Sequence, residues 1–75
     1  MKDLVRYLVK QLADHPDQVQ VQESDQGSSV SLHLTVAEED KGKIIGKQGK
    51  VIKAIRAVVG AAAAKAGKRS AVELD

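Results

Sequence analysis

The chain has 75 residues, the size of one small domain, and it contains no cysteine, Phe or Trp and only one tyrosine. This composition excludes disulfides, thiolate metal sites and platforms of stacked aromatic rings, and no apolar run approaches the ~20 residues of a membrane-spanning helix. The net charge of +2 is unevenly distributed: residues 41–69 hold nine basic side chains and no acid, whereas residues 1–40 hold three basic side chains and eight acids. We therefore expect a cytoplasmic protein with one surface that attracts polyanions.

The N-terminal half predicts one helix and a β-hairpin. Apolar residues in 2–14 recur in pairs four residues apart, which is typical of one helical stripe, and Pro16 ends it because the residue before a proline is disfavoured in the α region. Strict alternation of apolar and polar residues predicts half-buried strands at 18–23 and 30–36. The polar, glycine-containing segment 24–29 is the turn that joins them as an antiparallel pair.

The C-terminal half predicts two helices and a third strand. The acids of Glu38–Asp40 suit a helix start, and Gly67 suits a helix stop. The expected elements are a short helix from about 39 to 45, a turn at 46–49, a helix from 50 to about 66 and a strand at 69–74. A crossover through two helices implies that the third strand is parallel to the second. The order α-β-β-α-α-β therefore predicts an α+β fold, a two-layer sandwich with helices on one face of a mixed three-stranded sheet.

The most informative segment is 42–50, which reads Gly-Lys-Ile-Ile-Gly-Lys-Gln-Gly-Lys. Gly46 and Gly49 carry no Cβ, so another backbone can approach this turn closely. Lys47 and Gln48 lie between them, and more lysines flank the pair. This pattern suits a sugar-phosphate backbone held against a helix N-terminus. A turn without a binding role is the alternative, and it leaves the basic flanks unexplained.

Other chemistries fit the sequence less well. A nucleotide-binding P-loop needs a second glycine five positions before Gly49 and a Ser or Thr after Lys50, and the chain has neither. The dinucleotide fingerprint fails because Ile44 stands at the position of its first glycine. The two histidines do not form a zinc-ligand pattern, and no serine is paired with a base and an acid. We expect neither an enzyme nor a metal or cofactor site.

The run Ile44-Ile45-Gly46-Lys47-Gln48-Gly49, within the order α-β-β-α-α-β, resembles a type II KH domain, the arrangement of bacterial KH proteins. The resemblance covers residues 1–75 as a single KH domain and is strongest to small bacterial proteins built from one such domain. Further matching positions are Leu12, Pro16, Val19–Val21, Asp40–Lys43 and Ile52–Arg56.

The resemblance implies binding of single-stranded RNA without catalysis, as in RNA chaperones and post-transcriptional regulators. The Gly46–Gly49 loop would clamp the backbone of about four nucleotides. The bases would lie in an aliphatic groove, with Ile44 or Ile45 and the helix from Lys50 on one side and the strand at 69–74 on the other. The implied RNA-binding residues are Lys43, Ile44, Ile45, Gly46, Lys47, Gln48, Gly49, Lys50, Lys53 and Arg56.

The resemblance also implies protein partners. Similar proteins form homodimers, or pair with a second, larger RNA-binding protein that also has a KH domain (KhpB, also called Jag or EloR), and are linked to control of cell elongation. The helix from Lys50 is apolar around much of its girth, including Val51, Val58 and Ala61, which favours either an interface or a wider core under the N-terminal helix. Two alternatives therefore stay open beside RNA binding: a dimerising protein-interaction subunit and a binder of single-stranded DNA.

Overall fold

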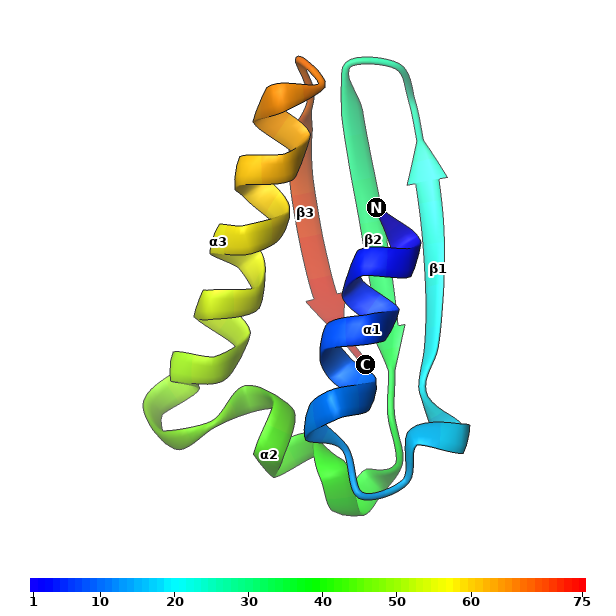
Figure 1. The fold of residues 1–75 in the computed structure, drawn as a ribbon, viewed down its shortest axis with the longest axis vertical. Helices are drawn as coiled ribbons and strands as arrows, with labels where there is room; N and C mark the ends of the chain where they lie inside the picture. Colours follow the sequence, from blue (N-terminus) through cyan, green and yellow to red (C-terminus); the bar gives the residue numbers. More distant parts are fainter.

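A computed structural model describes residues 1–75 and has the predicted order of elements. Figure 1 shows the helices on one face of a three-stranded sheet, which confirms the two-layer α+β fold. Short 3₁₀ turns precede β1, α2 and α3. The helices and strands are α1 (Lys2–Leu12), β1 (Gln20–Asp25), β2 (Ser29–Thr35), α2 (Lys41–Ile45), α3 (Lys50–Lys65) and β3 (Arg69–Leu74).

The sheet is mixed, with strand order β1-β2-β3. β1 and β2 are antiparallel and place Val21 opposite Leu34, whereas β2 and β3 are parallel and place Leu32 opposite Val72. The predicted parallel crossover is therefore confirmed. β3 lies at the edge of the sheet beside α3, so one side of its backbone is free of a neighbouring strand.

The core lies between the sheet and the two longer helices. Val5 and Val9 of α1 are fully buried, as is Val59 of α3. Every residue of the buried cluster is aliphatic, so the core depends on many small contributions at ~25 cal/mol per Å² of apolar area. The cluster comprises Val5, Val9, Val19, Val21, Leu32, Leu34, Val36, Ile44, Ile52, Ile55, Val59 and Val72.

The segment between α1 and β1 differs from the prediction at its boundaries. α1 ends at Leu12 instead of residue 14, and β1 begins at Gln20 instead of residue 18. The reason is a 3₁₀ turn at Pro16–Gln18, in which the Val19 N–H donates to the Pro16 carbonyl at 3.2 Å. Val19 is buried before the strand begins, so the alternating pattern identified the buried face correctly but not the strand start.

α3 ends as its glycine predicts. Gly67 has φ +73°, its N–H donates to the Ala64 carbonyl at 3.0 Å, and the Lys68 N–H donates to the Ala63 carbonyl at 2.8 Å. This Schellman arrangement satisfies the last carbonyls of the helix and turns the chain directly into β3. None of the helices combines the length and the apolar character needed to cross a membrane.

Candidate functional site

The Gly46–Gly49 loop joins α2 to α3 through an unusual backbone path. Gly46, Gln48 and Gly49 all have positive φ values, of 76°, 58° and 74°. Gln48 is the only residue other than glycine with a positive φ in the chain. Backbone in this region is unfavourable for residues with a Cβ, so Gln48 is held in a strained conformation, whereas the two glycines adopt it readily.

The two glycines are required for different reasons. A Cβ on Gly46 would overlap the Val51 side chain and would lie 2.9 Å from the Val51 backbone nitrogen. A Cβ on Gly49 would meet only ordinary contacts, the nearest 3.9 Å away on Ile52. Gly46 therefore lets the loop fold tightly onto the start of α3, whereas Gly49 supplies the left-handed turn that begins the helix.

The start of α3 is suited to an anion. Its N-cap is Gly49, no side chain caps it, and its first turn holds no acid. The first N–H groups of a helix lack intrahelical partners and carry a partial positive charge. In this helix the Lys50 N–H donates to the Lys47 carbonyl of the preceding 3₁₀ turn, which leaves the N–H groups after it for a ligand. Lys47 and Lys50 are exposed on either side of this helix end.

Acids from the N-terminal half neutralise part of the positive charge of residues 41–69. The Asp14 carboxylate raises the pKa of Lys43, and the Lys68 ammonium lowers the pKa of Asp25. Both pairs join residues far apart in the sequence. The three lysines paired in this way form the ion pairs Lys41–Glu38, Lys43–Asp14 and Lys68–Asp25.

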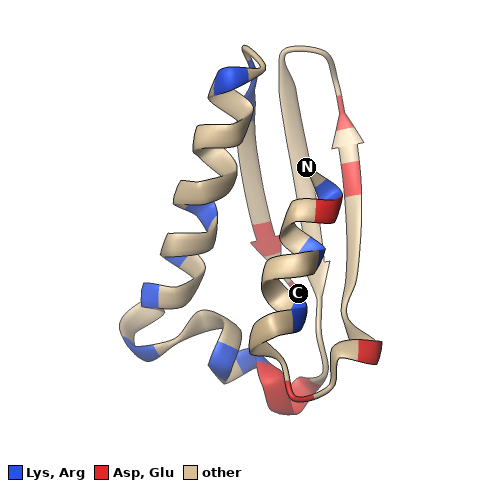
Figure 2. Ribbon diagram, in the orientation of Figure 1, with Lys and Arg blue, Asp and Glu red and all other residues tan.

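The lysines nearest the loop have no acidic partner. Lys47, Lys50 and Lys53 are exposed and make no ion pair. Figure 2 shows basic residues along α2, the loop and α3, and acids gathered on the 3₁₀ turn before α2 and on β1. The loop and the first turns of α3 therefore carry positive charge that no ion pair neutralises.

One face of α3 runs along the free edge of β3. The Arg56 Nε donates to the Val72 carbonyl at 3.1 Å, and a Cβ on Gly60 would lie 3.9 Å from the Ser70 hydroxyl. The α3–β3 groove between them has a volume of about 270 Å³ and is lined by Arg56, Ser70, Ala71, Val72 and Glu73. The face of α3 that borders this groove extends back to the loop. It carries four residues at helical spacing: Gly49, Lys53, Arg56 and Gly60.

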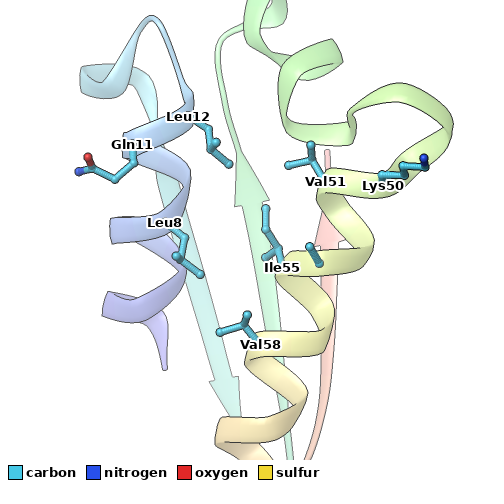
Figure 3. A pocket seen from close by; sticks show the side chains of 8 residues that line it. Leu8, Gln11, Leu12, Lys50, Val51, Ile55 and Val58 are labelled. Atoms are coloured by element: carbon cyan, nitrogen blue, oxygen red, sulfur yellow. The ribbon is translucent and has the colours of Figure 1, made fainter.

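A second, apolar groove lies on another face of α3, against α1 (Figure 3). Figure 3 shows Leu8, Leu12 and Val58 directed into it, and Gln11 and Lys50 directed away. Leu12 and Val58 remain 43% and 47% exposed. This α1–α3 groove has a volume of about 420 Å³ and is lined by Leu8, Gln11, Leu12, Lys50, Val51, Ala54, Ile55 and Val58.

Among the residues expected at the site, Ile44 is not on the surface, and Arg56 and Lys43 make contacts that the sequence does not reveal. Ile44 is fully buried in the core, and only its neighbour Ile45, 41% exposed, has a side chain on the surface. Arg56 is exposed, and its hydrogen bond to the Val72 carbonyl holds it against β3. Lys43 is exposed and paired with Asp14. Ile44 is therefore not available to line a groove, and Ile45 is the isoleucine of α2 that reaches the surface.

Asp40 supports the site in a way that the sequence does not reveal. It is the only buried charged residue, and its carboxylate accepts hydrogen bonds from the backbone N–H groups of Asp14 and His15, at 3.1 and 2.9 Å. The His15 ring Nδ1 lies 3.3 Å from the same carboxylate. Burial alone would raise the pKa of Asp40, but the hydrogen bonds from His15 and Asp14 outweigh it and hold the pKa below its usual value. Asp40 thereby fastens the end of α1 to the start of α2.

Comparisons with known proteins agree with this fold. Residues 2–74 match the model of a protein family described as "KhpA/KhpB, KH domain". The "RNA-binding protein KhpA" of Clostridium acetobutylicum is 53% identical over 74 residues, covering 99% of each chain. The proteins of the same name from Halalkalibacterium halodurans and Bacillus subtilis are 51% and 39% identical, covering 100% and 99% of this chain and 96% and 91% of their own. The chain belongs to the KhpA/KhpB family of KH-domain proteins.

Proposed function

We propose that this chain is a non-catalytic protein of the cytoplasm that binds single-stranded RNA and holds the RNA backbone at the Gly46–Gly49 loop. The observation that carries the proposal is the loop itself, a tight positive-φ turn that leads into an uncapped helix start. Three lysines without acidic partners surround it. The name "RNA-binding protein KhpA" of the full-length relatives supports the same conclusion.

Each part of the site has a separate task in this proposal. The N–H groups at the start of α3, with Lys47 and Gln48, contact the phosphates. Lys50 and Lys53 add longer-range attraction and contribute to the salt dependence of binding. The bases lie along the face of α3 that borders β3, where the walls are aliphatic and polar and offer no aromatic ring for stacking.

The direct test is fluorescence anisotropy with short single-stranded RNA at several salt concentrations. We expect the Lys47→Asp/Gln48→Asp variant to lose affinity by roughly tenfold or more, because it places two acids beside the phosphates. Lys10 and Gln22 offer a matched control, because both are exposed and neither lines a groove. Lys10→Asp/Gln22→Asp makes the same change in net charge and should reduce affinity far less. Equal losses in both variants would contradict a loop-centred site.

Competition between RNA and DNA oligomers of matched sequence separates RNA binding from general binding of single strands. The 2′-hydroxyl is the group that distinguishes the two. The proposal expects RNA to compete more strongly than DNA. Equal competition would indicate a protein that recognises single-stranded backbone of either kind.

A second function is favoured by the α1–α3 groove. We infer that this face binds protein, with a second copy of the chain as the first candidate and a larger KH-domain protein of the KhpB type as the alternative. Leu12 and Val58 are too exposed to serve the core of one chain, and an apolar groove of this kind is usual at interfaces. Analytical ultracentrifugation should show a dimer that Val58→Asp converts to a monomer, whereas the exposed Ala64→Asp does not.

A further inference from the structure

We propose that the α3–β3 groove accepts a guanine base of the bound RNA, recognised by Arg56 on one wall and Glu73 on the other. This inference rests on the proposed RNA-binding function and adds a base preference to it. The groove is polar, in contrast to the α1–α3 groove, and both residues line it.

The groove lies where a bound strand would pass. The face of α3 that carries Gly49, Lys53 and Arg56 leads from the loop to the groove within two helical turns. Neither Gly49 nor Gly60 has a side chain to obstruct this face, and Lys53 between them is exposed. A strand whose phosphate is held at the loop therefore brings a neighbouring base to Arg56.

Arg56 is oriented before any base arrives. Its Nε donates to the Val72 carbonyl at 3.1 Å, and it makes no ion pair. The remaining N–H groups of the guanidinium form a planar donor pair that is not used within the chain. A fixed, planar donor pair matches two acceptors side by side, as the O6 and N7 of guanine are.

Glu73 is the one acid that lines the groove. It is exposed on the edge strand and makes no ion pair. A carboxylate repels phosphates, and its two oxygens only accept hydrogen bonds. A carboxylate beside bound RNA therefore suits a base edge that donates hydrogen bonds to it.

Guanine fits both walls better than the other bases. Its N7 and O6 form an edge of two acceptors, and its N1–H and amino group form an adjoining edge of two donors. Adenine, cytosine and uracil each present a single donor group on the Watson–Crick edge, so none of them offers a two-donor edge to Glu73 beside a two-acceptor edge to Arg56. Donors on one wall and an acceptor on the other therefore select guanine.

The test uses oligouridine in which one central position is G, A, C or U, so that no guanine-rich structure forms. Fluorescence anisotropy with the wild-type chain should show the G oligomer bound about tenfold more tightly than the other three, the effect of one good bidentate contact. Glu73→Gln should remove most of this preference, so that the G oligomer falls to the affinity of the other three. Arg56→Lys, which keeps the charge and loses the planar fork, should also remove it.

Two controls separate the groove from the loop and from charge in general. Asp17→Asn, the same acid-to-amide change at an exposed site away from the groove, should keep the preference. The loop variant Lys47→Asp/Gln48→Asp should weaken binding of all four oligomers together. Loop-dependent binding with equal affinity for all four bases would overturn the guanine assignment and leave the proposed function standing. A guanine preference that survives both groove variants would also overturn it, and failure of the wild-type chain to bind any RNA would overturn both proposals.

Discussion

At the scale of single residues, the loop depends on two glycines that are not equivalent. Gly46, with φ 76° and ψ 172°, occupies a region that is essentially restricted to glycine, and the Val51 side chain fills the space of a Cβ. Gly49, with φ 74° and ψ 16°, is in the ordinary left-handed region, and a Cβ there would make only ordinary contacts. The sequence motif shows two glycines, and only the structure shows which of them is sterically locked.

We therefore expect Gly46→Ala to lower the free energy of unfolding by roughly 2–3 kcal/mol and Gly49→Ala by about 1 kcal/mol. Urea denaturation followed by circular dichroism measures both. Gly42→Ala is the matched control, because Gly42 lies in α2 with nothing within 4 Å of its Cβ position. It should leave stability unchanged or raise it slightly. Equal losses at Gly46 and Gly49 would show that the contact with Val51 does not matter.

Asp40 gives stability a dependence on acid pH. Its pKa is lower in the folded chain than in the unfolded chain, so its contribution is present above the unfolded value of about 3.9 and is lost as the pH falls through the folded value. We expect the urea midpoint of the wild type to fall on acidification below about pH 4. Asp40→Asn should be less stable at pH 7 and show a shallower fall. A residual slope should remain, because His33 and Thr35 lower the pKa of Asp75 and Lys68 lowers that of Asp25. Identical pH profiles would contradict this role of Asp40.

At the scale of elements, α2 is held from both ends. Asp40 ties its start to the segment after α1, and Gly46 packs its end onto α3. The Lys43–Asp14 pair adds a third link between α2 and that segment. A helix of five residues has little stability of its own, so these contacts position the loop.

If Lys43 binds RNA as the resemblance implies, the Asp14 carboxylate competes with the phosphates for it. Asp14→Asn removes that competition, and we expect affinity for single-stranded RNA to rise by about twofold at low salt, because an exposed pair is weak and screened. Asp17→Asn, an equal change of charge in the adjacent 3₁₀ turn, serves as the comparison. The same anisotropy assay measures both variants. A loss of affinity in Asp14→Asn would indicate that the pair positions α2 more than it masks Lys43.

The alternating and helical patterns were sufficient to predict the elements, because each depends on residues close in sequence. Val30, Leu32 and Leu34 of β2 are buried as their alternation requires. The burial of Asp40 and the bond from Arg56 to Val72 could not be predicted in this way. Their partners lie 25 or 26 and 16 residues away, and nothing in the local pattern marks the pairing. The boundary at β1 was missed because the turn after Pro16 keeps Val19 buried without placing it in the strand.

At the scale of the whole molecule, α3 separates two surfaces of different character. One face borders β3 with basic and polar groups, and another borders α1 with aliphatic groups. The loop stands at the end of α3 where both faces begin. The two proposed binding faces therefore differ in position and meet at Lys50, beside the loop.

An NMR titration of the ¹⁵N-labelled chain with a short single-stranded RNA would map the RNA-binding surface residue by residue. We expect the largest amide shifts at Gly46–Gly49, continuing along α3 at Lys53 and Arg56 and reaching Ser70–Glu73 of β3. Amides of Leu8 and Leu12, on the far wall of the α1–α3 groove, should change little. Shifts centred on the α1–α3 groove, with the loop unaffected, would contradict the claim that the loop and the β3 side of α3 form the RNA-binding surface.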